Sequence, residues 1–338
     1  MRLLILNVLF IVILNGCSSI DSSNTSISRP VIFPVDENYG IVLDDHGNLW
    51  YIELDENFDV DEIQKVCVKN VINFDYNGMT YHAVDKHGNV WFWSRTFPVL
   101  CEKIEREVMG GKVLKFTGYS GRNVTLFQDG TIDGKGFGGI NFSSFHDIIN
   151  VDISRLDRTI FAINQKGEIL IAGENNKLIS SDSTYIRKAT NIPSLKNIVK
   201  VGQISSSMPN YYAIDKDENF YYWGHSFSGA TPKLFEWPAN CLISSSFLLS
   251  TKDGNIMGYK YKSKGAYNAD LKLVAEKLPF DKGYDVFFLG QHSKKVIHLD
   301  EEGRLFIYDK TRSGANDELI ASNPKRIGDF KVDLSYYQ

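Results

Sequence analysis

The sequence has 338 residues, with 37 basic against 41 acidic side chains, a net charge of −4 and four cysteines. At roughly 100–200 residues per domain this length allows two domains, although large all-β folds run longer as one. The slightly acidic balance excludes a broadly basic nucleic-acid binder, and a mean hydropathy of −0.21 excludes a polytopic membrane protein. Aromatic residues make up 13% of the chain, which favours β-strands.

Residues 1–16 have the pattern of an export signal. Arg2 supplies a positive charge, and an apolar stretch follows from Leu3 to Leu14, interrupted only by Asn7. This stretch is too short to cross a bilayer comfortably as a helix. It has the length and charge of a secretory signal.

The signal ends in Leu14-Asn15-Gly16-Cys17, which resembles the lipobox of bacterial lipoproteins. The resemblance implies cleavage before Cys17 and acylation of this residue with palmitate-type chains, and two or three such chains anchor a protein stably. Ser18, at the next position, implies the outer membrane in an organism with two membranes, with the protein on the periplasmic or surface face. The alternative is an ordinary secretory signal with a chance cysteine. Residues 17–30 are rich in serine and predict a flexible tether.

Residues 31–338 repeat one pattern, in which a polar turn lies between two apolar strands. The copies are residues 41–50, 83–91, 126–132, 162–170, 213–221, 248–256 and 297–306. Glycine ends the turn in every copy except the fifth, where Glu218 takes its place, and successive turns are 36 to 51 residues apart. Such a period predicts a β-propeller with four strands per repeat rather than a helical solenoid. Seven sheets stacked in a ring bury their faces and hide most edges.

The turns account for a recurring aspartate. It lies in or beside the turn of five copies, at Asp44, Asp85, Asp129, Asp215 and Asp253. Calcium binding is one interpretation of these carboxylates, but aspartate is also preferred in turns, and we favour that role. His46 and His87 are likewise interpreted as turn residues, and each turn pair ending in glycine is predicted to supply the positive φ angles of a tight hairpin.

These repeats resemble the regulator-of-chromosome-condensation family. Its signature includes a V-x-x-V-x-x-G segment, a strand ending in Trp-Gly and a proline after that strand. The fifth copy shows it best, in Ile198–Gly202, Tyr222–Gly224 and Pro232. The resemblance implies an all-β, seven-bladed β-propeller over residues 31–338, closed by apolar stretches at 30–35 and 330–334. It also implies a protein-binding platform rather than an enzyme. A secreted bacterial member inhibits a β-lactamase, but neither that activity nor its contact residues are carried over to this sequence. A sharper form of the protein-binding hypothesis is an inhibitor or immunity protein that meets a toxin or hydrolase at the membrane.

Cysteine use leaves one question open. With Cys17 lipidated, Cys67, Cys101 and Cys241 remain, an odd number. An exported protein can hold a disulfide, and Cys67 and Cys101 fall in neighbouring repeats. Buried reduced thiols are the alternative.

Signals for catalysis are weak, and we predict no catalytic residue, metal or cofactor. The chain contains neither H-E-x-x-H nor C-x-x-C. Gly134–Gly139 matches G-x-G-x-x-G, but no βαβ pattern surrounds it. Four tryptophans at matching strand positions are predicted to pack between sheets: Trp50, Trp91, Trp93 and Trp223.

The loops before the first strand of each copy differ in chemistry while the strands repeat. In a propeller these loops open on one face, and tyrosine, arginine and methionine are typical interface anchors. The candidate partner-binding residues are Tyr76, Tyr119, Arg122, Arg155, Arg158, Met208 and His292. Neutral drift of the loops is the alternative. We expect a monomer that binds a protein partner and no nucleic acid, and the other hypotheses are a glycan or peptidoglycan receptor and an envelope assembly scaffold.

Overall fold

The computed structural model describes residues 30–32, 38–76, 80–94, 101–103, 111–154, 158–174, 185–203, 210–217, 219–224, 229–235, 241–243, 248–251, 256–262, 272–277, 283–288, 295–312 and 319–335. The predicted signal, Cys17 and nearly all of the tether lie outside them. Within the described residues the chain is all-β, with 27 strands in seven antiparallel sheets. None of the same residues forms a helix with the length and apolarity needed to cross a membrane.

The first four sheets follow the chain, each made of consecutive strands. The first holds β1 (Val31–Ile32), β2 (Tyr39–Leu43), β3 (Asn48–Leu54) and β4 (Val60–Lys69). The second holds β5 (Val71–Tyr76), β6 (Thr80–Asp85), β7 (Val90–Ser94) and β8 (Glu102–Lys103). The third holds β9 (Val113–Tyr119), β10 (Arg122–Phe127) and β11 (Ile132–Lys135). The fourth holds β12 (Ile148–Ile153), β13 (Ile160–Asn164), β14 (Ile169–Glu174) and β15 (Tyr185–Asn191).

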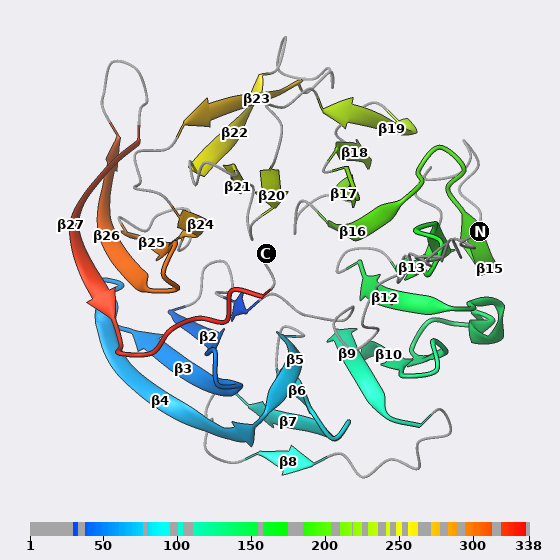
Figure 1. Cartoon of the computed structure of the whole chain (residues 1–338), viewed down its shortest axis with the longest axis horizontal. Coiled ribbons are helices and arrows are strands. Elements are labelled where there is room, and N and C mark those ends of the chain that lie inside the picture. The colour runs from blue at the N-terminus through cyan, green and yellow to red at the C-terminus, as the bar shows by residue number, and fades with distance from the viewer. Residues whose placement is uncertain are drawn as a thin grey trace, which may run out of the picture.

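Three more sheets complete a ring around a common centre (Figure 1). The fifth holds β16 (Ile198–Gln203), β17 (Asn210–Asp215), β18 (Phe220–Gly224) and β19 (Gly229–Phe235). The sixth holds β20 (Cys241–Ile243), β21 (Leu248–Thr251), β22 (Ile256–Lys262) and β23 (Lys272–Lys277). The seventh holds β24 (Gly283–Phe288), β25 (Lys295–Asp300), β26 (Leu305–Arg312) and β27 (Leu319–Ile327). Each hairpin expected from the repeats therefore lies in a sheet of its own.

The hydrophobic core lies between neighbouring sheets. One cluster joins the first and seventh sheets, with Ile52, Ile297 and Leu305 each at most 1% exposed. A second joins the first and second sheets through Tyr39 and Tyr81 among others. Further clusters join the third to the fourth sheet and the fourth to the fifth. Because each sheet buries its faces against two neighbours, the ring has to close for the end sheets to be covered.

The aspartate of each turn caps the backbone of its own hairpin. In the second sheet, Asp85 Oδ1 accepts the backbone N–H groups of His87 and Asn89 at 2.9 and 3.0 Å. Its Oδ2 accepts Asn89 Nδ2 at 2.8 Å and the indole Nε1–H of Trp91 at 3.0 Å. Burial alone would raise the pKa of Asp85, but these hydrogen bonds hold it below its ordinary value.

The same cap recurs around the ring, as the shared sequence pattern predicts. Asp44 and Asp215 bind their turns in the same way, and Asn164 and Asp300 take this position in the fourth and seventh sheets. Asp129, which directly precedes Gly130, instead accepts the backbone N–H and the hydroxyl of Thr131, at 2.9 and 2.6 Å. The turn role is thus confirmed for these predicted aspartates, while Asp253 lies outside the described residues.

The backbone of the turns differs from the prediction in one respect. Only the glycine takes a positive φ, at +73° for Gly47 and +82° for Gly88, whereas His46 and His87 do not. The amide of Gly47 donates to the Asp44 carbonyl at 3.0 Å. These are three-residue loops in which a left-handed glycine follows the turn, so the expectation that both residues of the pair have positive φ is wrong.

Both ends of the chain contribute to the first sheet, as predicted. β1, near the N-terminal end of the described chain, pairs with β2, while Val332 forms an isolated bridge with Asp44. The amide of Val332 also donates to the carbonyl of Gly303 in the seventh sheet, at 2.8 Å. In the second sheet the equivalent place is held by Val71, whose amide donates to Gly47 at 3.0 Å. The C-terminal segment therefore closes the ring (Figure 1).

A disulfide joins the outer strands of the first two sheets. Cys67 in β4 bonds to Cys101, which directly precedes β8, with 6.0 Å between the two Cα atoms, and the two residues are 34 positions apart in sequence. The alternative of buried reduced thiols is therefore wrong for this pair. Nothing is described of the Cys241 side chain.

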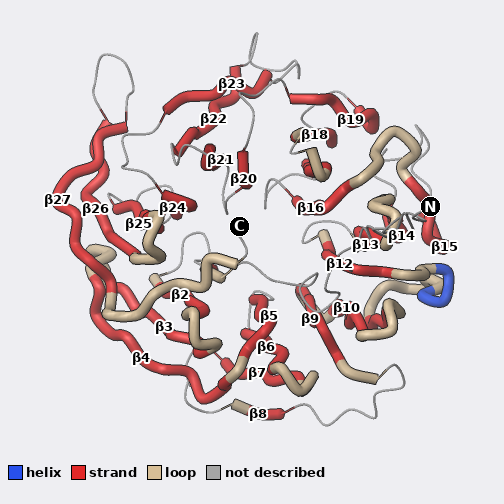
Figure 2. Tube along the Cα trace, viewed as in Figure 1, coloured by secondary structure: helices blue, strands red, loops and turns tan. Residues whose placement is uncertain are grey.

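The third sheet departs from the predicted four strands. After β11 the chain leaves its own sheet, meets the outer strand of the fourth sheet at Asn141 and then forms the short 3-10 helix η2 (Phe142–Ser144), drawn in blue in Figure 2. There Asn141 forms a parallel bridge with Lys188, and its amide donates to the carbonyl of Arg187 at 2.7 Å. The prediction of four strands is wrong for this repeat because these residues pair with β15 instead.

Candidate functional site

Several strand ends of the third and fourth sheets meet on one face of the ring. β9 and β10 are joined there by Ser120 and Gly121, both with positive φ, as a two-residue hairpin turn requires. In the fourth sheet Ile153 pairs with Ile160 and Glu174 with Tyr185, so the β12–β13 connection and the ends of β14 and β15 share one edge. Figure 1 shows β10 of the third sheet beside β12 of the fourth, with β15 on the outer side of the fourth sheet.

Three arginines gather around Tyr185 at this edge. Arg158 precedes β13, Arg187 lies on β15 and Arg122 begins β10. Burial is the largest influence on the Tyr185 hydroxyl and raises its pKa, while Arg158, Arg187 and Arg122 act in the opposite direction. All three guanidinium groups therefore lie within electrostatic range of one phenol.

The hydrophobic part of this site is supplied by tyrosines. Tyr119 and Tyr185 are partly buried and pack against the core shared by the third and fourth sheets. The Tyr185 hydroxyl donates to the carbonyl of Phe137. We call the set of Tyr119, Arg122, Arg158, Tyr185 and Arg187 the arginine rim.

Among the described residues, Glu174 places a carboxylate beside the arginine rim. Glu174 Oε1 lies 3.8 Å from Arg158 Nε, and the side chain of Arg158 is still 60% exposed. The two sheets that carry the rim are held together by Lys115 of β9, whose Nζ donates to Asn150 Oδ1 of β12 at 3.0 Å. The rim is thus a positively charged surface on a fixed framework, in which Arg158 and Arg187 are exposed and Arg122 is partly buried.

The predicted partner-binding residues divide into three groups. Tyr119 and Arg122 flank the β9–β10 turn, Arg158 precedes β13 in the next sheet, and all three belong to the rim. Tyr76 is 7% exposed, and its hydroxyl lies 2.8 Å from that of Tyr39, so its assignment as an exposed anchor is wrong: it belongs to the aromatic core of the first two sheets. The remaining three, Arg155, Met208 and His292, lie outside the described residues.

Sequence reasoning missed Tyr185 and Arg187. They are two positions apart on β15 and therefore share one face of that strand. That spacing is visible in the sequence. What brings them to Tyr119 and Arg122 is the crossing of residues 136–145 to the fourth sheet, for which the sequence carries no local signal.

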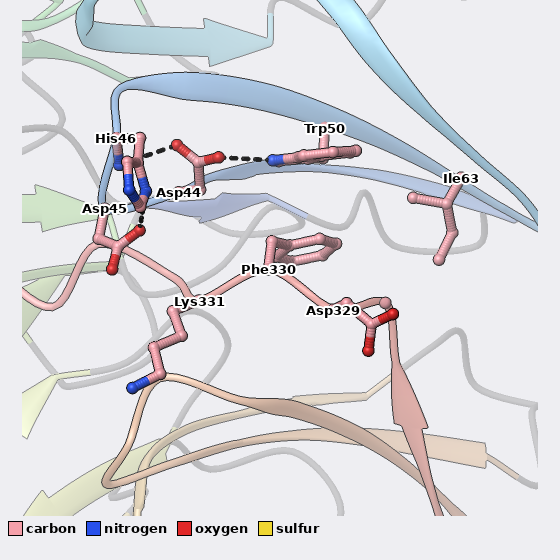
Figure 3. A pocket seen from close by; sticks show the side chains of 9 residues that line it. Asp44, Asp45, His46, Trp50, Ile63, Asp329, Phe330 and Lys331 are labelled. Carbon is pink, nitrogen blue, oxygen red and sulfur yellow. Dashed lines mark hydrogen bonds and ion pairs between the residues drawn. The ribbon is translucent and has the colours of Figure 1, made fainter.

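A hollow of about 660 Å³ lies at the seam where the C-terminal segment crosses the first sheet (Figure 3). Trp50 stacks on Phe330 there, with 5.2 Å between the ring centres. Asp44, Asp45 and His46 offer oxygen and nitrogen atoms within 4.8 Å of one another. Both oxygens of Asp44, however, already accept hydrogen bonds from its turn and from Trp50 Nε1. We therefore assign this cluster to the turn and the ring closure.

The tryptophans have two different environments. Trp93 and Trp223 are at most 1% exposed and lie, as predicted, in the clusters that join the first sheet to the second and the fourth sheet to the fifth. Trp50 and Trp91 are only half-buried, and each donates its indole N–H to the aspartate of its own turn.

No family model and no curated protein matches the sequence. Among solved structures, Prp20p from Saccharomyces cerevisiae matches with a TM-score of 0.57 and 15% identity, over 91% of this chain and 89% of that one. Hsv2 from Kluyveromyces lactis matches with a TM-score of 0.53 and 9% identity, over 90% and 99%. The Cps50 (Swd1) propeller from Myceliophteria thermophila matches with a TM-score of 0.52 and 13% identity, over 85% and 98%.

These likenesses show the fold. The ring of sheets is a β-propeller, and its structural neighbours include Prp20p and yeast RCC1 (Prp20) with Kap60 bound. At identities of 16% or less they carry no further information about this chain's activity.

Proposed function

We propose that this chain is an exported, lipid-anchored β-propeller that binds a protein partner on the arginine rim and performs no catalysis. The observation that carries the proposal is the convergence of tyrosine and arginine side chains from two sheets on one exposed face. Tyrosine and arginine are enriched among the residues that dominate binding energy in protein interfaces. A framework of paired strands holds them in place before binding, which lowers the entropic cost of association.

Two further observations support the proposal. The structure of Prp20p is described together with its binding to Gsp1p and histones, and a related structure holds Kap60 on RCC1, so propellers of this shape are used to bind proteins. The Cys67–Cys101 disulfide is of the kind that persists in an oxidising compartment, which agrees with the export signal.

Site-specific photo-crosslinking in the source cells tests the binding role. A photoreactive phenylalanine analogue at position 119 of the full lipoprotein is expected to yield one discrete crosslinked protein. The matched control places the analogue at Lys166, an exposed residue in the β13–β14 turn of the fourth sheet, at the end of these strands away from the rim, and is expected to give none. Equal products from both positions would contradict a specific face.

The same experiment separates the other hypotheses. A glycan receptor would give no protein adduct, whereas its binding to isolated cell-wall sacculi would disappear in Tyr119→Ala. An assembly scaffold would give several adducts that are lost together when the gene is deleted. If the single adduct is a hydrolase or toxin whose activity falls on binding, the narrower role of inhibitor or immunity protein follows.

Membrane attachment is predicted to depend on Cys17. Wild-type protein is expected in the membrane fraction with incorporated palmitate label, and Cys17→Ser in the soluble fraction without it, because the acyl chains supply the anchoring energy. Cys241→Ser is the matched cysteine control and is expected to stay with the membrane. A Cys17→Ser protein that remains with the membrane would contradict the lipoprotein assignment.

A further inference from the structure

We infer that the arginine rim recognises an acidic segment of its protein partner, with carboxylates seated on Arg122 and Arg187. This inference rests on the proposed function and adds the chemistry of the partner. It follows from the charge, the access and the geometry of the rim.

The charge of the rim is opposite to that of the whole molecule. The chain has a net charge of −4, yet three guanidiniums and a single carboxylate lie around Tyr185 among the described residues. Glu174 pairs with Arg158, so the excess positive charge falls on Arg122 and Arg187. A local positive surface on an acidic protein attracts an anionic partner and orients it as it approaches.

Glycines keep these guanidiniums open to a partner. Residues 136–139 run beneath them, and a Cβ added at Gly139 would lie 3.6 Å from Arg187 Nη1. At Gly136 an added Cβ would lie 2.8 Å from Arg122 Cγ. Both positions have positive φ, +89° and +87°, which disfavours any other residue. Gly136, Gly138 and Gly139 therefore place no side chain beside the two arginines, and the side chain of Phe137 between them is buried in the core.

Carboxylates fit the geometry better than other anions. Arginine presents a planar fork that binds a carboxylate through two parallel hydrogen bonds. Tyr119 and Tyr185 add aromatic surface beside the charges, which suits the aliphatic stems of glutamate and aspartate. A polymer of phosphates would have to pass over a molecule of net negative charge, and its affinity depends on many cationic contacts rather than on two.

Binding of a synthetic decapeptide tests the inference directly. The probe is a fluorescein-labelled peptide rich in glutamate and aspartate, and its matched control carries glutamine and asparagine at the same positions. Full-length lipoprotein in detergent micelles is expected to bind the acidic peptide at least about tenfold more tightly than the amide peptide, with binding weakened by salt.

Charge reversal locates the site. Arg122→Glu with Arg187→Glu is expected to reduce acidic-peptide affinity at least about tenfold. The control variant combines Lys86→Glu with Lys166→Glu and changes the net charge by the same amount. These two lysines are exposed in the β6–β7 and β13–β14 turns, away from the rim, so the affinity for the acidic peptide is expected to stay unchanged. If the glutamate pair fails to fold, Arg122→Gln with Arg187→Gln removes the charges without adding new ones.

Each outcome decides the inference. Loss of peptide binding in the rim pair and not in the control pair supports it. No preference of the wild type for the acidic peptide overturns it, as does tighter binding of a single-stranded oligodeoxynucleotide or of vesicles containing phosphatidylglycerol. If the Arg122→Glu, Arg187→Glu variant still crosslinks its protein partner through position 119, the protein-binding role stands. The inference that carboxylates of the partner bind these two arginines is then wrong. If wild type gives no crosslink, the proposed function falls on its own.

Discussion

Replacing Gly173 by alanine is expected to destabilise the protein by about 2–5 kcal/mol, because two costs add at this position. Gly173 is the last residue but one of β14, in the fourth sheet, and has a φ of +119°. A side chain in that region costs about 1–2 kcal/mol. An added Cβ would also lie only 2.7 Å from the carbonyl carbon of Arg158 and 2.8 Å from Thr159 Cα, so the backbone has to move, at about 1–3 kcal/mol.

Gly121→Ala is the matched control for the backbone term. Gly121 also has a positive φ, +78°, but an added Cβ meets nothing within 4 Å. Gly121→Ala should therefore lower the free energy of unfolding by only about 1–2 kcal/mol. Urea unfolding at neutral pH measures both variants, and an equal loss in the two would show that the Arg158–Thr159 backbone accommodates a methyl group.

Gly173→Ala is also expected to change the position of Arg158 in the arginine rim. The atoms that obstruct the new methyl group belong to Arg158 itself and to Thr159, whose hydroxyl donates to the Glu174 carbonyl at 2.7 Å. Moving this backbone shifts Arg158 relative to Arg122 and Arg187. Acidic-peptide affinity is therefore expected to fall in Gly173→Ala under conditions where the variant is still folded.

The hairpins could be predicted because their causes are local. Asp85 caps amides two and four residues ahead, and Gly88 supplies the one left-handed residue. Every one of these interactions joins residues a few positions apart, so the local sequence of each repeat is enough to determine its turn. The ring closure was also predictable, since a propeller leaves two open sheets that only apolar ends of the chain can cover.

The errors arise where partners are far apart in the sequence. Tyr76 has the composition of an interface residue, but Tyr39, 37 positions away in the adjacent sheet, buries it. The disulfide depends on how two sheets bring Cys67 and Cys101 together, which spacing alone leaves open. Arg187 joins the rim only because residues after β11 pair with β15 instead of completing their own sheet.

Phe330→Ala is expected to cost about 3–5 kcal/mol, the range for removing a buried phenylalanine. Phe330 is 9% exposed, packs in the core shared by the first and seventh sheets and stacks on Trp50 at 5.2 Å. The hollow beside it can admit water, which places the expected value at the lower end of that range. Equilibrium urea unfolding gives the free energy of unfolding.

The location of the loss tests the closure itself. Beyond Phe330, the amide of Val332 binds the seventh sheet at Gly303, and that of Asp333 binds the first sheet at Leu43, at 2.8 and 3.0 Å. Loosening this segment opens both contacts together, so hydrogen exchange should accelerate in β2 and at the β25–β26 turn but not in the fourth sheet. Asp329→Ala, next in the chain with a fully exposed side chain, should stay within about 0.5 kcal/mol of wild type. If Phe330→Ala matches that control, the ring is held closed by the strands on either side and not by the C-terminal segment.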